Sequence, residues 1–289
     1  MADEEDPEAK LAAARSTLAP KKVLMVLTST TTYPDGETPT GFWLTEAFHP
    51  YLRWLAAGWT VDFVSTAGTA QADPASVEDA TSKNDRAALD AYANIKEASI
   101  DTQPVLETLC TEEALPATVE AYDVLFFCGG YGTMWDLPEN ESVKALTKAM
   151  YEANKIVSAV CHGPIAFINV ELSDGTKLLA GKEVTAFTNG EEEAMGKTDI
   201  VAKPSGPGSC EDAMQWNNEE GAPAGATFKD GGVFAANVVV DGLLFTGQNP
   251  PSAAPLAEAV LFRLDPIRAK YDPPRAAMLA EREELVVRP

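Results

Sequence analysis

The chain has 289 residues, 45% of them hydrophobic, and carries a formal net charge of −22. This length and apolar content suit one large α/β domain and argue against wholesale disorder. The negative charge repels nucleic acid and anionic membranes, so neither is expected as a partner. No run of about 18 apolar residues occurs, and the acidic start MADEEDPEAK lacks the features of a secretory signal, so a cytoplasmic location is expected.

Short apolar runs alternate with amphipathic stretches along the chain. The expected strands are 23–27, 60–65, 122–128, 156–160 and 183–187, followed by a hairpin-like pair, 233–240 and 243–246. The expected helices are 41–57, 106–115, 139–154, one that starts near Pro164, and 253–264. Strands that alternate with helices predict an α/β fold, with a doubly wound and mainly parallel sheet flanked by helices in a flavodoxin-like sandwich.

The rest of the chain gives no sign of a second domain. Residues 1–20 are an acidic N-terminal extension, 21–265 are expected to form a single catalytic domain, and 266–289 are a charged C-terminal tail. Residues 203–232 are rich in Gly, Pro and Asn and have little periodicity. Because long loops of this kind in compact domains are often functional, a lid over the site is predicted here.

Two expected strands end in residues that are suited to chemistry. Gly129-Gly130 follows one strand, and Cys161-His162-Gly163-Pro164 follows another and leads into a helix. Ligands of such sheets bind at the carboxyl ends of the strands. A cysteine on a sharp strand-to-helix turn is a nucleophile elbow, and a helix N-terminus beside it favours the thiolate. The alternative is a buried structural cysteine beside a buried histidine.

Neither a metal nor a cofactor is expected. None of the four cysteines forms a CxxC pair and the chain has two histidines, so a zinc site of Cys and His is not indicated. The GGYG of residues 129–132 lacks the spacing of a dinucleotide-binding turn. We interpret the cysteines as free thiols, with Cys128 in the core and Cys110 and Cys210 unassigned, and His49 as a packing or capping residue.

Five segments, in this order, resemble the ThiJ/PfpI superfamily, whose fold is similar to that of class I glutamine amidotransferases. They are TGFWLTEAFHP (40–50), CGGYGTMWDLPEN (128–140), AVCHGPIAF (159–167), VTAFTNGEEE (184–193) and TGQNPPSA (246–253). The Cys-His pair with a downstream acidic turn resembles the glutathione-independent glyoxalases (glyoxalase III), a branch that overlaps with heat-shock chaperones. The resemblance implies a cofactor-free lyase that converts methylglyoxal to lactate through a cysteine hemithioacetal, and a homodimer that takes a small carbonyl substrate.

The resemblance also assigns roles to individual residues. It implies that Cys161 is the nucleophile, that Glu46 is the acid/base beside the thiol, and that the backbone N–H groups of Gly130 and His162 hold the developing oxyanion. Such chemistry is sound, because a thiolate is a strong nucleophile and a base within hydrogen-bond reach can move a proton next to a carbonyl. Burial should raise the pKa of Glu46. The alternative for Glu46 is a solvent-facing helical glutamate.

The resemblance also implies that His162 assists proton transfer and is oriented by a carboxylate from the acidic turn, residues 191–193. An ungapped count from Phe187 selects Glu192, with Glu191 and Glu193 as close alternatives. The competing interpretation is that three consecutive glutamates simply line a solvated surface.

Two features depart from the branch and leave the substrate open. Tyr131 stands where the Gly-Gly turn often continues with histidine, and the loop 203–232 is longer than expected. Tyr131 and Trp43 are expected to contact substrate, although large aromatic residues are as often part of a core. Competing hypotheses are a stress chaperone or redox sensor of the same fold, and another cysteine-dependent reaction, such as a hydratase or biosynthetic tailoring step on a larger substrate.

Overall fold

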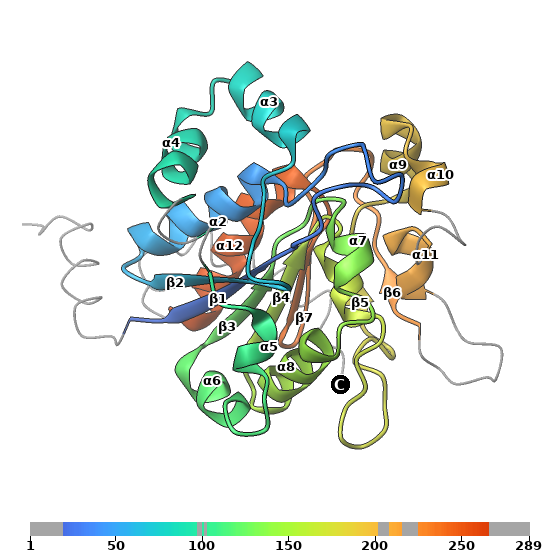
Figure 1. Ribbon diagram of the computed structural model, residues 1–289. Helices are drawn as coiled ribbons and strands as arrows, with labels where there is room; N and C mark the ends of the chain where they lie inside the picture. Colours follow the sequence, from blue (N-terminus) through green and yellow to red (C-terminus); the bar gives the residue numbers. More distant parts are fainter. Residues whose placement is uncertain (1–19, 97–99, 101–102, 202–207, 216–224, 266–289) are drawn as a thin grey trace, which may run out of the picture.

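The computed structural model describes residues 20–96, 100, 103–201, 208–215 and 225–265. Its centre is a six-stranded sheet with the strand order β2-β1-β3-β4-β8-β7 (Figure 1). The strands are β1 (Lys22–Leu27), β2 (Thr60–Ser65), β3 (Val124–Phe127), β4 (Ile156–Val160), β7 (Val238–Asp241) and β8 (Leu244–Gly247). Neighbouring strands pair in parallel except β7 with β8. The predicted α/β fold with a mainly parallel sheet is therefore confirmed.

Helices cover both faces of the sheet because its central strands are apolar on both sides. In β1, Val23, Met25 and Leu27 pack into one core cluster, and Leu24 and Val26 pack into the other, as side-chain alternation in a strand requires. The first cluster includes residues of α2 (Leu44–Ala56), α4 (Arg86–Ile95) and α12 (Pro250–Leu264). The second includes residues of α7 (Thr133–Asp136), α8 (Glu141–Glu152) and α11 (Cys210–Gln215).

The other helical segments are shorter. They are α3 (Pro74–Ser82), α5 (Leu106–Leu109), α6 (Leu115–Ala121), the 3-10 helix η2 (Gly163–Phe167), α9 (Asn189–Met195) and α10 (Thr198–Val201). Helices α9, α10 and α11 lie together at one side of the molecule, beside the small strand β6 (Thr227–Phe228) (Figure 1). Segments far apart in the sequence thus meet beside the ends of β3 and β4, where Cys161 lies.

Helix α2 begins three residues later than the predicted 41–57. Residues 41–43 are extended because their backbone groups bond to neighbouring segments instead of to a helix. The N–H of Phe42 donates to the carbonyl of Gln71 at 3.0 Å, and the N–H of Trp43 donates to the carbonyl of Gly129 at 3.0 Å. This extended segment presses the start of α2 against the turn that follows β3.

The prediction of a fifth long strand at 183–187 was wrong. Only Glu183–Val184 (β5) forms a strand, and it pairs in parallel with β6 in a separate two-stranded sheet. The next residues are buried but lie at the end of the main sheet, where the N–H of Thr185 donates to Thr246 Oγ1 and that of Phe187 to the carbonyl of Cys161. The apolar run 183–187 therefore reflects burial of these residues and not a long strand.

Three other predictions are corrected. The helix expected near Pro164 is the short 3-10 helix η2, strand β7 begins at Val238 and not at residue 233, and the acidic turn 191–193 belongs to helix α9. The segment 203–232 contains α11 and β6, while its residues 203–207 and 216–224 lie outside the described part. Residues 1–19 and the tail 266–289 also lie outside the described residues.

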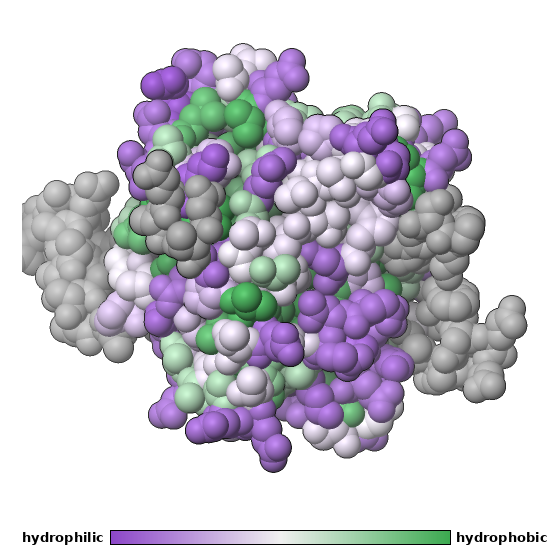
Figure 2. All heavy atoms as spheres, viewed as in Figure 1, coloured by the Kyte–Doolittle hydropathy of each residue, from purple (hydrophilic) through white to green (hydrophobic). Residues whose placement is uncertain are grey.

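The surface is mostly polar on the side drawn in Figure 2. Most of the face seen in Figure 2 is hydrophilic or neutral, with smaller apolar areas between. Among the described residues, no helix combines the length and the apolar character needed to cross a membrane.

Candidate active site

Cys161 lies on a strained turn at the end of β4. Its φ is +60°, in the left-handed region that residues with a side chain rarely adopt. Backbone bonds hold it there, since its N–H donates to the carbonyl of Gly247 at 2.8 Å and its carbonyl accepts from Phe187 at 2.9 Å. A Cβ on Gly163 would lie 2.6 Å from the carbonyl oxygen of Phe127, so the turn needs glycine there. This is the geometry of a nucleophile elbow.

The Glu46 carboxyl group meets the cysteine at the turn after β3. Glu46 stands in the first turn of α2 and is fully buried. An ideal Cβ on Gly129 would lie 2.3 Å from Glu46 Oε2 and 2.7 Å from Cys161 Cβ. Both side chains therefore approach the space that a side chain at position 129 would fill, so this position must be glycine.

Burial raises the pKa of Glu46 to about 8, while the Cys161 thiol and the Gly129 backbone act in the opposite direction. Neither carboxyl oxygen has a well-aligned hydrogen-bond partner among the described residues. An unsatisfied carboxyl in a buried position is costly and is typical of a functional site.

Burial also raises the pKa of the Cys161 thiol, and the carboxylate of Glu46 raises it further. The N-terminus of a long helix, which was expected to favour the thiolate, is replaced by the five residues of η2. Cys161 and Glu46 thus form a buried pair in which the negative charge of one disfavours ionisation of the other.

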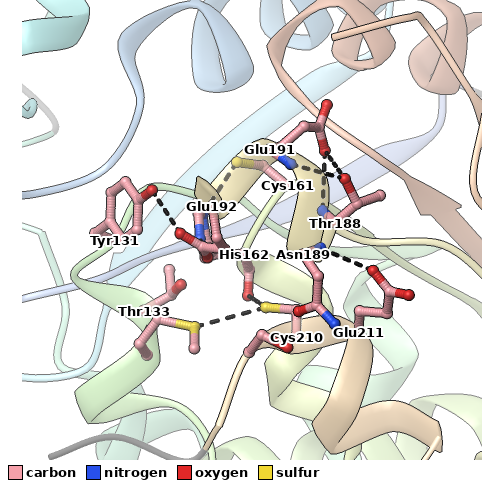
Figure 3. A network of polar contacts seen from close by, with 12 residues as sticks. Tyr131, Thr133, Cys161, His162, Thr188, Asn189, Glu191, Glu192, Cys210 and Glu211 are labelled. Atoms are coloured by element: carbon pink, nitrogen blue, oxygen red, sulfur yellow. Dashed lines mark hydrogen bonds and ion pairs between the residues drawn. The ribbon is translucent and has the colours of Figure 1, made fainter. Parts of the chain in front are cut away.

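A chain of polar contacts links Cys161 to helix α9 (Figure 3). Cys161 Sγ lies 3.2 Å from His162 Nδ1, and His162 Nε2 lies 2.8 Å from Glu192 Oε1. The hydroxyl of Tyr131 donates to Glu192 Oε2 at 2.8 Å. Because a glutamate that accepts at Nε2 fixes the proton there, Nδ1 of the neutral imidazole is the acceptor that faces the thiol.

The three consecutive glutamates have three different environments. Glu192 is buried against His162, Glu193 is exposed, and Glu191 is buried but points away from the imidazole (Figure 3). Glu191 forms a capping box with Thr188 at the start of α9. Its Oε1 accepts from the N–H of Phe234 at 2.9 Å and from the Asn249 and Gln248 side-chain amides at 2.7 and 3.1 Å. Glu191 therefore fastens α9 to the two loops around β7 and β8.

The N–H groups of Gly130 and His162 donate no hydrogen bond within the described residues. Gly130 has a φ of +108°, and a Cβ there would lie 2.3 Å from the carbonyl oxygen of Gly41. Gly130 follows the end of β3, and His162 directly follows Cys161 at the end of β4. The two N–H groups remain candidates for holding a developing oxyanion.

The two aromatic residues that were expected to contact substrate have different surroundings in the structure. Tyr131 is buried, with its ring centroid 4.2 Å from that of His162 and its hydroxyl committed to Glu192. Trp43 is half-buried, and its buried Nε1 has no hydrogen-bond partner among the described residues. Tyr131 therefore supports the His162–Glu192 pair, and the indole N–H of Trp43 is left available.

Two residues beside the site were not assigned from the sequence. Cys210 is buried, with Sγ 3.8 Å from the carbonyl oxygen of His162, and it comes from a segment whose sequence has no periodicity. The ring centroid of Phe187 lies 4.6 Å from that of His162 and 6.2 Å from that of Tyr131. The apolar run 184–187 was a signal for Phe187, but it was interpreted as a strand. His49 lies elsewhere, paired with Asp85 at 2.6 Å.

The comparisons with known proteins agree with the fold and with the order of the sequence motifs. A model of the DJ-1/PfpI family matches residues 38–262. Glyoxalase 3 of Candida albicans is 33% identical over 252 residues, which cover 83% of this chain and 97% of that protein. Glutathione-independent glyoxalase hsp3102 of Schizosaccharomyces pombe is 32% identical over 246 residues, which cover 80% of this chain and 92% of that protein.

Among solved structures, the X-ray structure of Rapid Encystment Protein 24 KDa (REP24) of Francisella tularensis matches with a TM-score of 0.71 and 33% identity. The match covers 83% of this chain and 97% of that one. Fold, motif order and sequence identity over most of the length lead to the same conclusion. The chain belongs to the DJ-1/PfpI family.

Proposed function

We propose that the protein is a glutathione-independent glyoxalase, which converts small 2-oxoaldehydes such as methylglyoxal to 2-hydroxy acids such as lactate. One observation carries the proposal most directly. The buried Glu46 carboxyl group, with a pKa raised to about 8 and no aligned hydrogen-bond partner, lies against Cys161. An aldehyde bound to that thiol brings a C–H bond beside a base, which is what an internal proton shift needs.

In the first step the thiol adds to the aldehyde carbon. Sγ forms a bond to C1, the thiol proton passes to His162 Nδ1 at 3.2 Å, and the aldehyde oxygen becomes an alkoxide. The N–H groups of Gly130 and His162 would hold this oxygen, which then takes the proton back from the imidazole to give a hemithioacetal. Glu192 keeps the proton on Nε2 and stabilises the imidazolium while it exists.

In the second step the ionised Glu46 removes the proton from C1 of the hemithioacetal. The electron pair forms an enediolate across C1 and C2, and the proton is then returned to C2. The product is a thioester of lactate on Cys161. Carbon C1 is oxidised and C2 is reduced, so no external oxidant, reductant or glutathione is required.

In the last step water adds to the thioester carbonyl and the C1–S bond breaks. Lactate leaves and the thiol regains a proton, so the sum is methylglyoxal plus water to lactic acid. Tyr131 keeps Glu192 in place throughout, and the indole N–H of Trp43 is a candidate donor to the second carbonyl oxygen.

The test is to incubate the purified protein with methylglyoxal in the absence of glutathione. We expect loss of the aldehyde and the appearance of an equal amount of lactate, and added glutathione should not accelerate the reaction. Loss of aldehyde without lactate would instead indicate simple adduct formation on the protein. No consumption at all would reject the proposed activity.

A further inference from the structure

A row of aromatic rings leads from the buried centre of the site to the surface. Ring centroids of His162 and Phe187 are 4.6 Å apart, and those of Phe187 and Phe234 are 6.4 Å apart. Phe187 is almost completely buried, whereas Phe234 is 44% exposed. The backbone of Phe187 is also hydrogen-bonded to that of Cys161, since the N–H of Phe187 donates to the carbonyl of Cys161. A ring at the surface is thus one contact away from a ring that touches the catalytic imidazole.

The backbone of Phe234 is held in an unfavourable conformation. Its φ is +56°, which is unusual for any residue with a side chain and more so for a bulky one. The hydrogen bond from its N–H to the buried carboxylate of Glu191 fixes this conformation. Glu191 is itself held by Asn249 and Gln248. An exposed aromatic ring kept in place by a strained backbone and a buried carboxylate is placed for a function, because such strain persists only where the surroundings enforce it.

We propose that Phe234, backed by Phe187, determines the specificity of the site and that aromatic 2-oxoaldehydes (arylglyoxals) are preferred over methylglyoxal. This inference rests on the proposed function and names its substrate class. An arylglyoxal carries the same aldehyde for Cys161 and the same ketone beside it, with a flat ring in place of the methyl group. Aromatic rings interact favourably at centroid distances of 4.5–7 Å, and a methyl group offers no comparable surface to Phe234.

The first test compares kcat/KM for phenylglyoxal and methylglyoxal in the wild type, Phe234→Ala and Phe234→Tyr. We expect Phe234→Ala to lower the value for phenylglyoxal by about tenfold, the effect of one aromatic contact, and to change that for methylglyoxal by less than about twofold. Phe234→Tyr should retain the preference. Leu55→Ala, which removes a side chain that is 42% exposed near the end of α2, is the matched control. An equal loss for both substrates, or no loss, would overturn the proposal.

A second measurement decides the role of Phe234 even if the glyoxalase activity is absent. The rates of alkylation of Cys161 by iodoacetanilide and by iodoacetamide are compared, because the two reagents differ in an aromatic ring. The ratio of the two rates should fall in Phe234→Ala and stay unchanged in Leu55→Ala. A wild type that converts neither aldehyde would reject the proposed function alone. An unchanged alkylation ratio would reject the role of Phe234.

Discussion

Replacing Glu46 by glutamine is expected to lower kcat/KM for methylglyoxal by about 10³-fold, within the range for loss of a general base. The amide keeps the size of the side chain but cannot accept the C1 proton of the hemithioacetal. Glu193→Gln is the matched control, because Glu193 is exposed on α9 and the substitution makes the same chemical change away from the thiol. It should leave the rate within about twofold of the wild type, as is usual for surface substitutions. A Glu46→Gln enzyme with normal activity would exclude Glu46 as the base.

The pH dependence of the reaction rate provides a second test of Glu46. Because burial raises the pKa of Glu46 to about 8, most of the carboxyl is protonated at pH 7, and the fraction able to act as a base rises as the pH passes through about 8. The wild-type rate should therefore rise over that interval. Any residual rate of Glu46→Gln should lack that rise.

The substitution should also change the thiol. The Glu46 carboxylate raises the pKa of Cys161, so removing its charge should lower that pKa and shift the pH profile of Cys161 alkylation to lower pH. Burial remains, and the pKa should stay above that of a free cysteine. A profile that moves to higher pH would mean that a protonated Glu46 stabilises the thiolate through a hydrogen bond. The thiol, and not the carboxyl, would then carry the negative charge of the pair.

Gly129→Ala is expected to impair both the fold and the reaction. The new Cβ would lie 2.3 Å from Glu46 Oε2, 2.5 Å from the carbonyl oxygen of Val160 and 2.7 Å from Cys161 Cβ, so the backbone must shift. Such overpacking costs about 1–3 kcal/mol of unfolding free energy. A misplacement of about 1 Å at the reacting groups costs about 10²-fold in rate. Denaturant unfolding and kcat/KM per folded molecule measure the two effects.

Gly175→Ala is the control that distinguishes a lower unfolding free energy from a disturbed arrangement of Glu46 and Cys161. Gly175 has a φ of +85° and no atom within 4 Å of an added Cβ. Alanine there is strained by about 1–2 kcal/mol but touches nothing at the site, so the folded molecules should keep full activity. If Gly129→Ala folds and works as well as Gly175→Ala, Glu46 and Cys161 are not in contact at that glycine.

The sequence predicted those features that depend on a short local segment, such as a turn or a buried strand. The elbow was predictable because Cys161 directly follows a buried strand and Gly163 permits the close turn. The parallel sheet followed from continuous apolar runs such as Val124–Phe127. Counting from Phe187 selected Glu192, and the structure places that carboxylate on His162.

Other features depend on contacts that no local pattern encodes. The run 183–187 is apolar because it packs beside Cys161, and its backbone bonds go to Thr246 and Cys161 instead of a strand ladder. Glu191 and Glu192 are adjacent and chemically identical, and only the turn of α9 sends one to the loops and the other to the imidazole. Cys210 reaches the site from a segment whose sequence shows no periodicity.

The measurement that tests the account most directly is lactate formation from methylglyoxal, without glutathione, by Cys161→Ser beside Cys110→Ser. Cys110 is a half-buried thiol in the turn after α5, so its loss controls for removal of a cysteine as such. The account predicts that Cys110→Ser makes lactate at the wild-type rate, and that Cys161→Ser loses activity by at least about 10⁴-fold, because a serine hydroxyl is a far weaker nucleophile. Lactate formation by Cys161→Ser at a rate near that of the wild type would contradict it.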